Sequence, residues 1–130
     1  SKRIKVTLYN KTFKEIDMTD FTVIPEGLFA DRDDIVEVVL PEGVKVISAN
    51  AFENCQRLEK VVFPSTLERI GEEAFVNCTS LKEADYGKDV KIAPTSFAVA
   101  ATFNYSFYIL TKYNWDVWRI LLSGYYRERL

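Results

Sequence analysis

A repeat of 23 residues constrains the fold more than any other feature of the sequence, because it occurs twice almost unchanged. Each copy carries an isoleucine, a phenylalanine five residues later, an Asn-Cys pair and a leucine. The paired anchors are Ile47 and Ile70, Phe52 and Phe75, Asn54-Cys55 and Asn77-Cys78, and Leu58 and Leu81. A fixed period of about 20 to 29 residues with apolar anchors is typical of a solenoid, in which each repeat packs as one coil against the next. The sequence therefore predicts a repeat protein.

Degenerate copies flank the two strong ones. Downstream, Ile92 and Phe97 recur one residue early. The upstream anchors are Ile24, Phe29, Ile35, Val38 and Leu40, and a more distant set, Phe13, Ile16 and Met18, shows a slip of one residue. We expect a single domain, residues 1–130, with about four coils in residues 21–102, an N-terminal cap in residues 1–20 and an aromatic C-terminal cap in residues 103–130.

The pattern Ile-x4-Phe-x2-Cys-x2-Leu-x2-Val-x-Phe-Pro, read from residues 47–64, resembles the bacterial BspA-type leucine-rich repeats. The resemblance covers roughly residues 13–100, although Arg32 and Ala100 replace the cysteine in the outer copies. It implies an α/β fold, a short right-handed solenoid with one strand per coil, used to bind other macromolecules. Many relatives are surface proteins of host-associated bacteria.

The N-terminal residues are expected to form a β-hairpin. Residues 3–9 alternate between polar and apolar side chains, residues 13–18 form a second strand, and Asn10-Lys11 between them suits a tight turn. The hairpin would cover the first coil, because the terminal coils of a solenoid need caps.

Each coil is expected to contribute one strand to a single parallel sheet. These strands are predicted at residues 35–40, 58–63 and 81–86. Pro41 and Pro64 end two of them, since proline cannot donate to the ladder. Residues 48–54 and 71–77 are expected to form a short helical turn on the outer side.

The C-terminal part is strongly aromatic: nine of the 18 aromatic residues lie between Phe103 and Tyr126. Residues 104–111 suit an extended segment, and residues 115–130 suit a helix with an N-cap at Asn114. Its apolar face is too wide for a solvated helix. The helix is therefore expected to cap the last coil, or else to expose Trp115 and Tyr125 as a contact surface.

Cys55 and Cys78 occupy the same repeat position. Neighbouring coils lie about 4.8 Å apart, so distance alone allows a disulfide. Stacked coils, however, point their side chains in parallel directions, and a buried cysteine acts as a small apolar filler. We expect two free, buried thiols.

The chain has no histidine, which removes histidine-based acid–base catalysis and most metal sites. Its five glycines are scattered, so no phosphate-binding loop is present. We expect no catalytic residue, no cofactor and no metal. A net charge of −2 without a run of basic residues argues against a nucleic-acid partner, and the apolar stretches are too short for membrane insertion.

Strand alternation predicts which side chains lie on the open face of the sheet. These are Glu15, Asp17, Glu37, Val39, Lys60, Val62, Glu83 and Asp85. Five are acidic and two are valines on adjacent coils, which predicts an acidic face with an apolar seam, suited to a basic protein partner. The same charges would also serve solubility alone.

The predicted function is that of a non-enzymatic protein-binding module. Two alternatives remain: a structural segment of a larger bacterial surface repeat protein, and a small intracellular inhibitor or adaptor. A complete chain would be expected in the cytoplasm, and a fragment of a longer family member at the cell surface or outside the cell.

Overall fold

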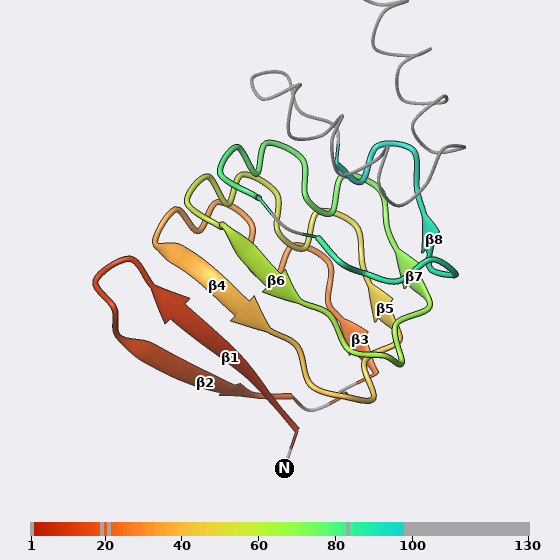
Figure 1. The fold of residues 1–130 in the computed structure, drawn as a ribbon, viewed down its shortest axis with the longest axis horizontal. Helices are drawn as coiled ribbons and strands as arrows, with labels where there is room; N and C mark the ends of the chain where they lie inside the picture. The colour runs from red at the N-terminus through yellow and green to blue at the C-terminus, as the bar shows by residue number, and fades with distance from the viewer. Residues whose placement is uncertain (1, 19, 21, 83, 98–130) are drawn as a thin grey trace, which may run out of the picture.

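The computed structural model describes residues 2–18, 20, 22–82 and 84–97 as a stack of coils that begins with a hairpin (Figure 1). Its strands are β1 (Arg3–Leu8), β2 (Phe13–Asp17), β3 (Val23–Ile24), β4 (Ile35–Val39), β5 (Val46–Ile47), β6 (Lys60–Val62), β7 (Arg69–Ile70) and β8 (Lys91–Ile92). The extended segment and the helix predicted at the C-terminus, with Trp115 and Tyr125, lie outside the described residues.

The strands form two sheets, where the sequence predicted one. Sheet A has the order β2-β1-β4-β6, and sheet B has the order β3-β5-β7-β8 (Figure 1). Parallel pairs are offset by one repeat, as in Val38 with Val61 and Ile47 with Ile70. The single-sheet prediction was wrong because every buried backbone group needs a partner. The two-residue segment that ends at each isoleucine anchor therefore pairs with the same segment of the next coil, which forms a second sheet.

The hairpin extends sheet A. β1 lies between β2 and β4 and is antiparallel to both, with Val6 opposite Val38. The hairpin tip is also attached to the coils, because the Tyr9 N–H donates to the Asp34 carbonyl at 2.8 Å and the Arg57 guanidinium lies 4.9 Å from the Tyr9 ring centroid. The predicted cap is therefore an integral edge of the sheet.

The core is built from columns of equivalent residues. Phe29, Phe52, Phe75 and Phe97 are buried and stack with ring centroids 5.2, 4.9 and 5.1 Å apart. Ile24, Ile47 and Ile70 form a second fully buried column. The shortened last repeat keeps both columns, since β8 pairs Ile92 with Ile70. The register predicted from the repeat is thus the one that the coils adopt.

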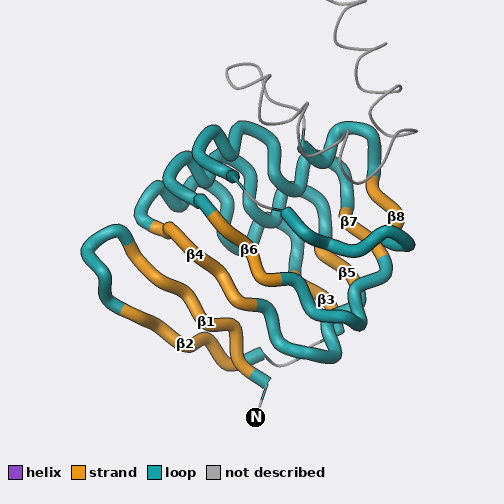
Figure 2. The backbone as a smooth tube through the Cα atoms, viewed as in Figure 1, coloured by secondary structure: helices purple, strands orange, loops and turns teal. Residues whose placement is uncertain are grey.

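Turns replace the helical turns predicted at residues 48–54 and 71–77, where no residue is helical (Figure 2). The N–H groups of Asn50, Phe52 and Asn54 donate to carbonyls of the next coil at 3.1, 2.8 and 2.9 Å. Bonding between coils prevents an intrahelical ladder, which would need the same donors.

These turns require residues with positive φ at two repeated positions. One column is Gly27, Asn50 and Glu73, with φ of 68°, 60° and 56°, and the other is Asp31, Asn54 and Asn77, with φ of 63°, 60° and 60°. Glycine, asparagine and aspartate tolerate this left-handed region best, so the repeated asparagines serve the backbone. Glu73 is the residue least suited to its place.

The predicted strand at residues 81–86 is absent from the described part of that segment, residues 81–82 and 84–86. Ala84 and Asp85 stand where β6 has Val61 and Val62, and both residue types are poor strand formers. One bond between coils persists, from the Lys82 N–H to the Glu59 carbonyl at 3.0 Å.

Both cysteines are free and buried, as predicted. The Cys55 Sγ–H donates to the Phe29 carbonyl and the Cys78 Sγ–H to the Phe52 carbonyl, each at 3.1 Å. The neighbouring Cys55 thiol, together with burial, raises the pKa of Cys78 well above its usual value. The thiols therefore satisfy carbonyl groups inside the solenoid.

Candidate functional site

The open face of sheet A gathers most of the predicted contact residues into rows that cross the strands. One row is Glu15, Lys5, Val39 and Val62, and the next is Phe13, Thr7, Glu37 and Lys60. Asp17 lies opposite Arg3 in a third row. Asp85 is exposed but lies outside any strand, and Glu83 lies outside the described residues.

The insertion of β1 changes the charge of this face. Arg3 forms ion pairs with Glu15 at 3.0 Å and with Asp17 at 2.7 Å. These contacts, the hydrogen bond to Glu15 above all, raise the pKa of the Arg3 guanidinium. Lys5 adds a second cation beside Val39. The face therefore carries both signs, whereas β2, β4 and β6 alone suggested an acidic one.

Exposed apolar side chains concentrate on sheet A and its hairpin. Phe13 is 78% exposed, Tyr9 60% and Val62 37%, while Val39 is half-buried. The sequence assigned Phe13 to the core as an anchor, and that assignment was wrong. Antiparallel pairing places Phe13 opposite Thr7 on the open face and Lys14 opposite Val6 on the core side.

Lys14 also bears on the free edge of β2. A lysine at a core-side position of an edge strand discourages the addition of another strand. Lys14 is exposed although its neighbour Ile16 packs against the core. The open face of sheet A is thus better suited to a partner than its edge.

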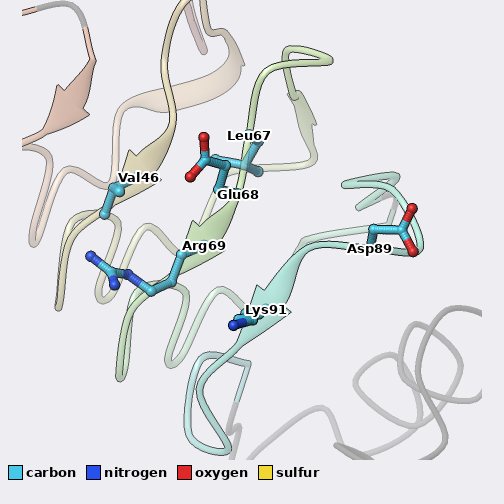
Figure 3. Close-up of a pocket in the computed structure, with 6 residues that line it drawn as sticks. All are labelled: Val46, Leu67, Glu68, Arg69, Asp89 and Lys91. Carbon is cyan, nitrogen blue, oxygen red and sulfur yellow. The ribbon is translucent and has the colours of Figure 1, made fainter.

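A second surface feature lies on the outer side of sheet B. Its central row is Val23, Val46, Arg69 and Lys91. A hollow of about 450 Å³ here is lined by Val46, Leu67, Glu68, Arg69, Asp89 and Lys91 (Figure 3). This hollow was not predicted from the sequence.

The described residues contain no group of three or more histidine, cysteine, aspartate or glutamate residues that could hold a metal ion. Nor do they contain a helix with the length and apolar character needed to span a bilayer.

A family model matches most of the chain. The model for the BspA type leucine rich repeat region fits residues 5–112 with six copies, which exceeds both the four coils and the 13–100 span expected from the anchors. No curated protein and no solved structure was found to match the chain.

Proposed function

The chain belongs to the BspA-type leucine-rich repeat family, whose repeats commonly bind proteins, and we propose that it is a non-enzymatic protein-binding module that uses the open face of sheet A. A solenoid presents an extended, regular surface, and a sheet face holds its side chains at fixed spacing. Both properties suit recognition of a folded partner better than chemistry on a small substrate.

The observation that carries the proposal is the exposed apolar side chains of sheet A. Among the described residues, three of the four exposed large hydrophobic side chains belong to sheet A or its hairpin tip, namely Tyr9, Phe13 and Val62. Val62 lies beside Val39 in register, which gives the seam two adjacent members. Burial of Phe13 in an interface is worth about 2–3 kcal/mol, enough to make it an anchor.

The charges around this seam define the partner further. Arg3 forms ion pairs with Glu15 and Asp17. Among the described residues, no ion pair is formed by Lys5, Glu37 or Lys60. A partner surface with an apolar centre and charges of both signs therefore fits better than the uniformly basic one suggested by the sequence. Such rim charges set the orientation and the rate of association.

The test is selective retention of a partner by surface variants. Phe13→Asp and Val62→Arg each place a charge in the seam, while Leu28→Asp changes an exposed apolar residue outside sheet A and serves as the matched control. Proteins retained by the immobilised wild type and by Leu28→Asp should be lost from Phe13→Asp and Val62→Arg. Equal retention by all four would refute the proposal, once urea unfolding shows that each variant is folded.

A further inference from the structure

The hollow on sheet B contains two basic side chains in direct register. β7 and β8 are parallel neighbours, and Arg69 is paired with Lys91. Adjacent strands lie about 4.8 Å apart, and like charges directly opposite one another destabilise a sheet. An anion bound between the two side chains would remove this repulsion.

Arg69 and Lys91 differ from two other arginines of the described residues, which form ion pairs. Arg3 binds Glu15 and Asp17, and Arg32 binds Asp34 at 2.9 Å. Arg69 and Lys91 have no ion-pair partner in the part of the chain that the structure describes.

The acids that line the hollow form no ion pair with these cations. Figure 3 shows Arg69 extending toward the side of Val46, whereas the Asp89 carboxylate points to the opposite side. The Glu68 carboxylate points to the side of Val46, but it forms no ion pair with Arg69 or Lys91. Among the described residues, no acid is therefore paired with the basic end of the hollow, which can accept an external anion.

An apolar wall adjoins the basic end. Val46 pairs in register with Arg69, one coil away, so an apolar position and a cationic position lie next to each other. Adjacent strands lie about 4.8 Å apart, so one small ligand can contact both positions. A volume of about 450 Å³ is also in the range of small-ligand sites.

We propose that this hollow binds the C-terminal residue of a peptide that ends in an apolar amino acid. Arg69 receives the terminal carboxylate through two parallel N–H···O bonds, the arrangement that guanidinium and carboxylate groups favour, and Lys91 adds a second charge. The apolar side chain of the same residue lies on Val46. This site is separate from the open face of sheet A and would serve a different part of a partner, or a different partner.

The test is an NMR titration of the full chain with N-acetyl-leucine, which carries the carboxylate and the apolar side chain without the rest of a peptide. We expect saturable shifts at the Val46 methyl groups and the Arg69 side-chain N–H, with a dissociation constant on the order of millimolar, as for other fragments of this size. N-acetyl-leucinamide, which lacks the charge, should bind at least about fivefold more weakly.

Variants make the test specific to the hollow. Arg69→Gln should weaken binding of N-acetyl-leucine at least about fivefold, because it removes the charged fork. Arg57→Gln, which changes an arginine outside sheet B, should leave binding unchanged, as should Val62→Arg on sheet A. The proposal is overturned if the amide binds as well as the acid, if sodium acetate binds as well as N-acetyl-leucine, or if Arg69→Gln binds like the wild type. Failure of the sheet A proposal would leave each of these outcomes unaffected.

Discussion

Replacement of Phe52 by alanine tests whether the stacked phenylalanines hold the coils together. Phe52 is fully buried and stacks on Phe29 at 5.2 Å and on Phe75 at 4.9 Å. A buried Phe→Ala change costs about 3–5 kcal/mol, and each aromatic pair contributes about 0.5–1.5 kcal/mol beyond burial. Because Phe52 makes two such pairs, the cost of Phe52→Ala should lie near the upper end of the first range, at about 4–5 kcal/mol. A domain of this size is stable by only about 5–15 kcal/mol, so the variant should lose a large fraction of its stability.

Urea unfolding followed by circular dichroism measures this loss. With an m-value of about 1.5 kcal/mol/M, the midpoint of Phe52→Ala should fall by about 3 M. Phe52→Leu keeps most of the volume and removes the stacking, and should cost about 1–2 kcal/mol. Leu28→Ala, at an exposed position, should change the midpoint little. A cost below about 2 kcal/mol for Phe52→Ala would refute the view that the rings form a continuous, tightly packed column.

Three further predictions concern the turns, the thiols and one carboxylate. Glu73→Asn should raise the free energy of unfolding by about 0.5–1 kcal/mol, since Glu73 has a φ of 56° at a position where the other coils have Gly27 and Asn50; a lower urea midpoint would contradict this. Cys55 and Cys78, which are 0% and 3% exposed, should react with a thiol reagent at least about 100-fold more slowly in the native than in the unfolded chain, and fast native labelling would show that they are not buried. The Arg32 hydrogen bond lowers the pKa of Asp34, so this carboxylate stabilises the fold above its unfolded pKa of about 3.9 and the contribution is lost as the pH falls through the lower folded value. Asp34→Asn and Arg32→Gln should both flatten the acid end of the stability–pH profile, and an unchanged profile would show that the pair is not coupled to folding.

The repeat made the core predictable, and long-range pairing did not follow from it. Phe52 and Phe75 occupy equivalent positions in the sequence repeat and stack on each other. The 23-residue period is therefore enough to predict which side chains form the column of rings. The pairing of β1 with β4 joins Lys5 to Val39, residues that no local pattern connects. A hairpin lying over the first coil would have satisfied the same alternation.

For the candidate surfaces, too, the repeat predicted some positions, and long-range pairing determined the rest. The repeat correctly placed Glu37, Val39, Lys60 and Val62 on one face, because they lie in register on β4 and β6. The net charge of that face depended on β1, whose Arg3 and Lys5 add positive charges beside the expected acids. The hollow on sheet B was hidden for a further reason, since two-residue strands such as β7 and β8 give too short an alternation to recognise.

The antiparallel junction between β1 and β4 has a consequence for how such a chain can grow. The free side of β4 is occupied by β1, so a further parallel coil cannot be added there without displacing the hairpin. Between the coils, in contrast, backbone bonds and side-chain bonds such as Asn77 to Asn54 recur at intervals of 23 residues. A duplication of 23 codons inside the array would preserve every column and lengthen the solenoid by about 4.8 Å. The open face of sheet A can therefore evolve in steps of one coil, while the hairpin keeps Tyr9 and Phe13 at a fixed end.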